Sequence, residues 1–189
     1  VMIAMALACN PKLLIADEPT TALDVTIQAQ ILDQLADLQA QRDMTVVLIT
    51  HNLGVIARMA DRVGVMYAGE IVERGPLAAV FDRPVHPYTQ GLIGSSPDVD
   101  AADERLDPIP GNVPSLRDEE MGDRCYFADR CPKVMEECLN KPPEFDVARG
   151  DGDRAQDRPP AAQGHGAKCY LADHDFEPAA ALPEDYFDE

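Results

Sequence analysis

Apolar residues gather in two short runs, and each run ends in polar side chains. The first covers residues 13–16 and is followed by Asp17 and Glu18, and the second covers residues 44–50 and is followed by His51. Neither run alternates with charged residues, which is typical of strands buried on both faces of a parallel sheet. Because ligands bind at the carboxyl ends of such strands, we expect these three polar side chains at the ligand edge.

Helical spacing is clear between the two strands, where apolar positions in residues 25–41 recur every three or four residues opposite a polar face. Residues 62–67 and 70–74 flank Ala68-Gly69 and indicate a β-hairpin. The remaining predicted helices cover residues 1–9, 52–60, 77–81 and 86–92. We expect the first of them to be buried, with Met2, Met5 and Cys9 in the core, and the last to be a capped surface helix.

Two adjacent carboxylates at a buried strand end repel each other, so Asp17 and Glu18 need a cation or a shared proton. In a nucleotide hydrolase, Asp17 would hold Mg²⁺ and Glu18 would direct the attacking water. The alternative is an Asp-Glu pair that caps a turn and simply ends the strand. His51 likewise has two interpretations, a hydrogen-bond donor to the terminal phosphate or a cap of the following helix.

The order of these features adds information, because Thr21-Ala22-Leu23-Asp24 follows the carboxylates at once and His51 follows one strand later. In this order the chain resembles the ATP-binding subunit of an ABC transporter. The resemblance implies an α/β fold, the C-terminal part of a P-loop ABC ATPase domain. It also implies a Walker B strand ending in the catalytic Glu18, a D-loop whose Asp24 lies at a dimer contact, a switch histidine at His51, and bound ATP with Mg²⁺ at Asp17.

Four of the five cysteines lie in the second half of the chain, at Cys125, Cys131, Cys138 and Cys169. Four thiolates are enough for a tetrahedral zinc ion or an iron-sulfur cluster, although the tight pairs of most structural zinc sites are missing. Buried free thiols and disulfides remain as alternatives. The long insertion before the last cysteine leaves His165 as a substitute ligand or as a solvated loop histidine.

Further motifs point to one branch of the family. His86-Pro87-Tyr88-Thr89, Ile109 to Leu116 and Arg124 to Pro132 resemble the oligopeptide and dipeptide (peptide/nickel) branch of ABC importers. That resemblance implies a [4Fe-4S] cluster held by the four cysteines, with zinc as the alternative. The implied partners are a second ATPase subunit, the transmembrane permease subunits and, indirectly, an extracellular solute-binding protein, at the cytoplasmic face of the membrane.

Composition divides the chain into four parts. We expect the ATPase part at residues 1–94, a Pro- and Asp-rich connector at 95–120, a small irregular cysteine-containing extension at 121–176, and an acidic, disordered tail at 177–189. Residues 150–166 have the composition of an inserted flexible loop.

The formal net charge is −18, most of it after residue 95. Such a charge disfavours nucleic acid as a partner and is typical of proteins adapted to high salt. No apolar run approaches the roughly 20 residues of a membrane-spanning helix.

The chain holds no Gly-x-x-x-x-Gly-Lys-[Ser/Thr] loop and no signature loop. We therefore expect the C-terminal piece of a longer subunit, inactive in ATP hydrolysis by itself. The alternatives are a soluble ABC ATPase outside transport and a free-standing metal-binding module.

Overall fold

The structure is a computed structural model that describes residues 2–21, 23–95, 109–114, 122–147 and 164–172. The chain divides into two compact units after Ala60. This division does not coincide with the predicted end of the ATPase part at residue 94, so the domain limits stay a prediction. Most of the predicted connector, most of the inserted loop and the whole acidic tail lie outside the described residues.

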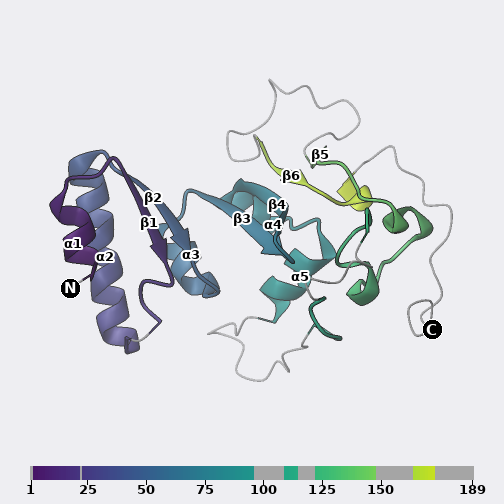
Figure 1. The fold of residues 1–189 in the computed structure, drawn as a ribbon, viewed down its shortest axis with the longest axis horizontal. Coiled ribbons are helices and arrows are strands. Elements are labelled where there is room, and N and C mark those ends of the chain that lie inside the picture. Colours follow the sequence, from purple (N-terminus) through teal and green to yellow (C-terminus); the bar gives the residue numbers. More distant parts are fainter. Residues whose placement is uncertain (1, 22, 96–108, 115–121, 148–163, 173–189) are drawn as a thin grey trace. The chain divides into compact units, whose positions relative to one another are not determined.

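The first unit contains helices around two parallel strands (Figure 1). Leu13 lies opposite Thr45 and the pairing continues to Asp17 opposite Ile49. Parallel neighbours need a crossover connection, which the long second helix supplies. The elements in order are α1 (Met2–Ala8), β1 (Leu13–Asp17), α2 (Val25–Arg42), β2 (Thr45–Ile49) and α3 (Leu53–Met59).

The strands β1 and β2 were expected to be buried on both faces, and this expectation is wrong. Leu14 packs with Leu35 of α2 on one face, while Ile15 and Val47 are 63% and 44% exposed on the other. Within the described part of the first unit, α1 and α2 supply the core on only one face of the strand pair. An apolar run without alternation therefore does not show how many faces the rest of the fold covers.

Helix α1 was also expected to be buried, which is wrong for three of its predicted core residues. Met2 and Met5 are 84% and 68% exposed, and Cys9 is exposed. Only Leu7 is buried, with Ile3 beside it. Positions four apart share a face, so the helix contacts the core through one stripe.

The second unit is built on the predicted hairpin, which the structure confirms. Ala68 and Gly69 both have positive φ, 45° and 81°, as the tight primed hairpin turns require. Two short segments extend the hairpin into a sheet of order β3-β4-β6-β5 (Figure 1). The strands are β3 (Arg62–Tyr67), β4 (Glu70–Pro76), β5 (Phe145–Asp146) and β6 (Gly166–Ala167), with helices α4 (Leu77–Asp82) and α5 (Pro87–Gly94).

The cysteine-containing extension shares its core with this hairpin. Phe127 is buried against Tyr67 of β3 and Tyr88 of α5, with ring centroids 5.2 and 5.5 Å away. Arg130 contacts the described part of the predicted connector, since its Nε donates to the carbonyl of Pro110 at 2.7 Å. The described part of the extension also contains short 3₁₀ turns at Ala128–Arg130, Glu136–Leu139 and Tyr170–Ala172.

None of the helices in the described part of the chain combines the length and apolar character needed to cross a membrane.

Candidate functional site

Glu18 is placed at the carboxyl edge of β1 and β2 by an unusual backbone conformation. Its φ is 47°, in the left-handed region that costs about 1 kcal/mol for a residue with a Cβ. The Glu18 N–H donates to the carbonyl of Ile49 at 2.8 Å, which ties the turn to the end of β2. Strained backbone of this kind is concentrated at functional sites.

The Glu18 carboxylate is held at both of its oxygens. Thr21 Oγ1 donates to Oε2 at 2.5 Å, and His51 Nδ1 lies 2.6 Å from Oε1. These hydrogen bonds, that of Thr21 first and that of His51 second, lower the pKa of Glu18 below its ordinary value. The structure therefore brings together the two residues predicted to be catalytic and adds Thr21, whose contact depends on a turn that no sequence pattern indicated.

Asp24 and the residue after His51 act as helix caps. Asp24 Oδ1 accepts the N–H of Ile27 at 3.0 Å at the start of α2. Asn52 Oδ1 accepts the N–H groups of Gly54 and Val55 at the start of α3. The interpretation of His51 as the cap is therefore wrong. Asp24 as a dimer contact stays a prediction.

Asp17 is the last residue of β1 and is exposed. It lies beside Glu18 at the predicted ligand edge, which leaves its carboxylate open to a ligand from outside the strand pair. Its role toward Mg²⁺ stays a prediction.

The four cysteines of the extension are free thiols, two of them buried (Cys138, Cys169) and two partly buried (Cys125, Cys131). The Cys125 N–H donates to the carbonyl of Cys138 at 3.0 Å, and Cys125 packs against the buried cluster that contains Cys138. Burial raises the pKa of Cys125 and of Cys131 to about 11 and that of Cys169 to about 12. The other three thiols raise the pKa of Cys169 further.

Gathered thiols with raised pKa values stay protonated at neutral pH unless a positive charge joins them. Among the described residues, no group of three or more His, Cys, Asp or Glu side chains is arranged to hold a metal ion. The ligand role of the four cysteines therefore stays a prediction.

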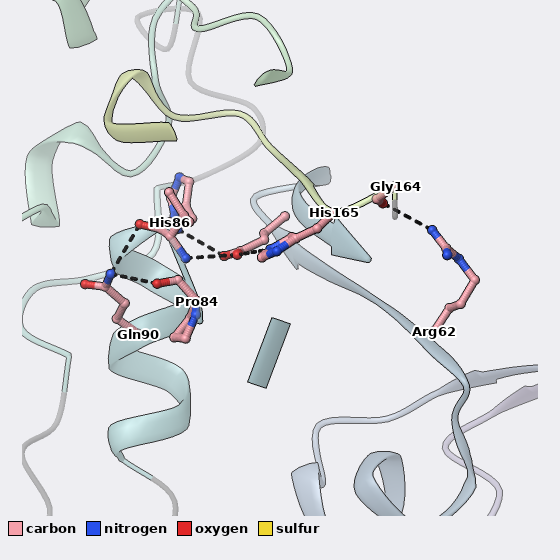
Figure 2. A network of polar contacts seen from close by, with 8 residues as sticks. Arg62, Pro84, His86, Gln90, Gly164 and His165 are labelled. Carbon is pink, nitrogen blue, oxygen red and sulfur yellow. Dashed lines mark hydrogen bonds and ion pairs between the residues drawn. The ribbon is translucent and has the colours of Figure 1, made fainter. Parts of the chain in front are cut away.

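His165 is buried, and its Nε2 atom contacts a carboxylate instead of the thiols. The residue is 3% exposed, and its Nε2 lies 2.8 Å from Glu73 Oε1. The interpretation as a solvated loop histidine is therefore wrong. The pair links β4 to the segment that carries Cys169 (Figure 2).

Glu73 is 1% exposed and joins three parts of the second unit. Its oxygens accept the N–H groups of Val85 and His86 at 2.9 and 3.0 Å, in addition to the contact with His165. Burial by itself would raise the pKa of Glu73, but the hydrogen bonds from His165 and from these two N–H groups outweigh it, and the pKa is lowered. The carboxylate is thus ionised inside the protein.

His86 was expected on a surface helix, and this is wrong because the residue is buried. It does cap α5 as predicted, since its Nδ1 accepts the N–H of Tyr88 at 3.1 Å. Burial lowers the pKa of His86 to about 4, so the ring is neutral at physiological pH. Gln90 secures the approach to the helix by donating to the carbonyls of Pro84 and Val85 (Figure 2).

Comparison with known proteins gives two kinds of match. The oligopeptide/dipeptide transporter C-terminal region matches residues 72–138. The chain is 52% identical over 145 residues to the oligopeptide transport ATP-binding protein AppD of Bacillus subtilis, covering 77% of this chain and 44% of AppD. It is 54% identical over 138 residues to the dipeptide transport ATP-binding protein DppD of the same organism, covering 73% of this chain and 41% of DppD.

These matches agree with the order of strand, carboxylates, histidine and cysteines in the chain. The mixed α/β structure, with parallel and antiparallel strands, agrees with that of part of an ABC ATPase. The chain belongs to the family of ATP-binding proteins of ABC peptide importers. It spans under half the length of the curated relatives that it matches.

Proposed function

We propose that this chain is part of an ATP-hydrolysing subunit that powers the import of peptides across the cytoplasmic membrane. The observation that carries the proposal is the pair of Glu18 and His51, 2.6 Å apart at the ends of two parallel strands. The names of the relatives, oligopeptide and dipeptide transport ATP-binding proteins, support peptides as the cargo.

In this proposal Glu18 accepts the proton of the water that attacks the terminal phosphate. Its lowered pKa keeps the carboxylate ionised at neutral pH, and Thr21 and His51 fix its direction. His51 also donates to the terminal phosphate. Asp17 holds Mg²⁺, which when bound neutralises the charge on the phosphates.

The phosphate-binding loop and the signature loop are supplied outside these residues, and Asp24 contacts a second ATPase subunit. The subunit lies at the cytoplasmic face of the membrane, where closure of the two subunits drives the permease, and a solute-binding protein delivers the cargo. A soluble ABC ATPase outside transport is less consistent with the match to the transporter C-terminal region.

We also propose that Cys125, Cys131, Cys138 and Cys169 hold a [4Fe-4S] cluster. Four free thiols of the second unit, all buried or partly buried, have the donor chemistry of such a cluster, which when bound would supply the positive charge that these sulfur atoms need to ionise. Zinc, which also takes four thiolate ligands, is the alternative occupant of the same residues. The cluster joins the segments before and after the long insertion.

Replacing Glu18 by Gln tests the assignment of the base. In the longer subunit that contains this chain, Glu18→Gln should lower the rate of ATP hydrolysis by roughly 10² to 10⁴-fold and leave ATP binding unchanged, since only the proton acceptor is lost. Asp37→Asn, at an exposed carboxylate of α2, is the matched control and should keep full activity. Full hydrolysis by the Glu18→Gln variant would refute the proposed base.

Anaerobic purification tests the cluster. The protein should be brown and contain about four iron and four sulfide per chain. Cys169→Ser should lose the colour, while Cys9→Ser, at an exposed cysteine in the other unit, should keep it. A colourless protein with about one zinc per chain would refute the cluster and restore the zinc alternative.

A further inference from the structure

The segment that carries Cys169 joins the sheet through a very short strand. β6 contains two residues, paired antiparallel with β4 so that Ala167 lies opposite Glu73 and Gly166 opposite Arg74. The Lys168 N–H continues the pairing by donating to the carbonyl of Val72 at 2.8 Å. Two residues, Gly and Ala, offer no hydrophobic pattern that could fix this register.

The space over Gly75, which His165 next to β6 occupies, distinguishes one register from the others. Counting back along the antiparallel pairing places His165 opposite Gly75. A Cβ on Gly75 would lie 3.1 Å from His165 Cα and 3.2 Å from its Cδ2, so only glycine leaves the histidine its full space. Gly75 and Glu73 are two residues apart on one face of β4, and the imidazole that occupies the space over Gly75 meets Glu73 Oε1 at 2.8 Å.

The register decides where the Cys169 thiol points. Residues 165 and 167 fall on the same face of the strand, and Cys169 lies in the bend that follows β6, directly after Lys168, whose N–H still pairs with Val72. Ala167 is fully buried and Cys169 is buried. A slip of one residue would shift the start of this bend along β4 and so move Cys169 away from its position relative to Cys125, Cys131 and Cys138.

The other side-chain contacts of this segment are weaker candidates for fixing the register. Lys168 Nζ lies 3.8 Å from Glu70 Oε2, and Arg62 donates to the carbonyl of Gly164 at 3.2 Å (Figure 2). Both are partly or fully exposed to solvent, where ion pairs and hydrogen bonds contribute little. A slip would break a buried contact at His165, which leaves Glu73 ionised without one of its donors.

We propose that His165 is a positioning residue for Cys169, because its contact with Glu73 over Gly75 fixes the register of β6 on β4. His165 thus positions the thiol of Cys169 relative to those of Cys125, Cys131 and Cys138. The same carboxylate fixes the start of α5, so the cysteine segment and the helix are positioned from one point. The function of this positioning rests on the proposed four-cysteine site. The positioning of Cys169 by His165 does not depend on a bound metal.

Thiol alkylation of the chelator-treated chain of 189 residues tests the proposal. The rate at which N-ethylmaleimide labels each cysteine is followed by peptide mass spectrometry, with Cys125 as the internal reference. In His165→Ala, labelling of Cys169 should become about tenfold to a hundredfold faster relative to Cys125, the scale of losing one hydrogen bond to a buried charge.

Matched variants separate positioning from general folding. His165→Gln offers an N–H donor at similar reach and should restore most of the protection of Cys169. Gly75→Ala should weaken the protection, whereas Gly64→Ala in the same hairpin, where a Cβ meets only the Ile71 side chain at 3.4 Å, should not. The proposal is overturned if Cys169 stays protected in His165→Ala, or if all four thiols become reactive together.

Failure of the cluster proposal gives a different result. A chain that binds neither iron nor zinc but shows selective labelling of Cys169 in His165→Ala keeps the positioning role of His165. A brown protein whose Cys169 is equally protected with and without His165 keeps the cluster and removes the positioning role.

Discussion

At the scale of single residues, the candidate catalytic carboxylate is constrained more tightly than its sequence context suggested. Glu18 combines a positive φ with hydrogen bonds to each of its two oxygens. A general base needs a fixed direction toward its water, and hydrogen bonds to the ionised form supply that at the cost of basicity. The hydrogen bond from Thr21 therefore lowers the proton affinity of the Glu18 carboxylate and fixes its orientation.

Thr21→Ala tests this effect. Removing the hydroxyl takes away the first cause of the lowered pKa, so the pKa of Glu18 should rise toward its ordinary value of 4.5. Thr21→Ser keeps a hydroxyl and should leave the pKa low. NMR titration of the Glu18 carboxyl carbon measures the effect, with Thr26→Ala on α2 as the control. An unchanged pKa in Thr21→Ala would show that the contact with Thr21 does not persist in solution.

His86 makes a prediction about acid stability. Burial lowers its pKa from 6.5 to about 4. Between these two pH values the unfolded chain therefore binds a proton at His86 and the folded chain does not. The free energy of unfolding should therefore fall as the pH falls from 6.5 to about 4, by roughly 3 kcal/mol at most. Urea unfolding followed at a series of pH values measures this slope.

The control for this slope is His86→Asn. Asparagine is a good helix cap and can still accept the Tyr88 N–H, but it does not titrate. The variant should lose the part of the slope between pH 6.5 and 4.5, above the range in which Glu73 contributes. An equal slope in both proteins would mean that other groups govern the acid stability.

At the scale of elements, the sequence predicted the strands, the helices and the hairpin within one or two residues. It also predicted that Glu18 and His51 lie at the same edge of the sheet, because the edge rule for parallel strands depends only on where each strand ends, but it did not predict their contact. It could not predict β6, since a two-residue strand has no periodicity and its partner lies about 90 residues away. The signals of that contact were local, namely Gly75 near Glu73 and the glycines on both sides of His165.

Burial was the part that pattern reasoning misjudged. A run such as residues 13–16 shows that a strand is apolar, but Leu13 and Ile15 are exposed because the described fold covers one face only. Glu73 shows the opposite error, since a charged residue in a hairpin is expected at the surface and is instead enclosed with three hydrogen-bonding groups. Both depend on long-range packing.

Glu73 and Glu70 of β4 form a natural pair for a stability measurement. Glu73→Gln puts an amide where the carboxylate accepts two N–H groups from one segment, those of Val85 and His86, and a contact from His165, so the free energy of unfolding should fall by about 3 kcal/mol or more. Glu70→Gln breaks contacts with Lys141 and Lys168 that are partly open to solvent, and it should cost at most about 1 kcal/mol. Urea unfolding at pH 7 compares the two. Equal losses would contradict the role of Glu73 as the central contact of the second unit.

At the scale of the whole molecule, the cysteine extension is a part of the second unit and not a separate attachment. It shares the buried Phe127 with the hairpin, adds two strands to the same sheet and is fixed through Glu73. A cluster at the four cysteines would therefore add to an existing core. The loss of iron should lower the stability of the second unit without unfolding it.

The net charge of −18 leads to the last prediction. Charges of one sign repel most strongly in the compact state, and salt screens them, with a Debye length of about 10 Å at 0.1 M and about 3 Å at 1 M. Ion pairs of the fold, such as Arg58 with Asp33, are weakened by the same screening, but they are few beside the excess of acidic residues. The urea midpoint should therefore rise between 0.1 and 1 M KCl with an unchanged m value. A midpoint that stays constant or falls would exclude salt adaptation, since the screened repulsion would then be smaller than the screened attraction.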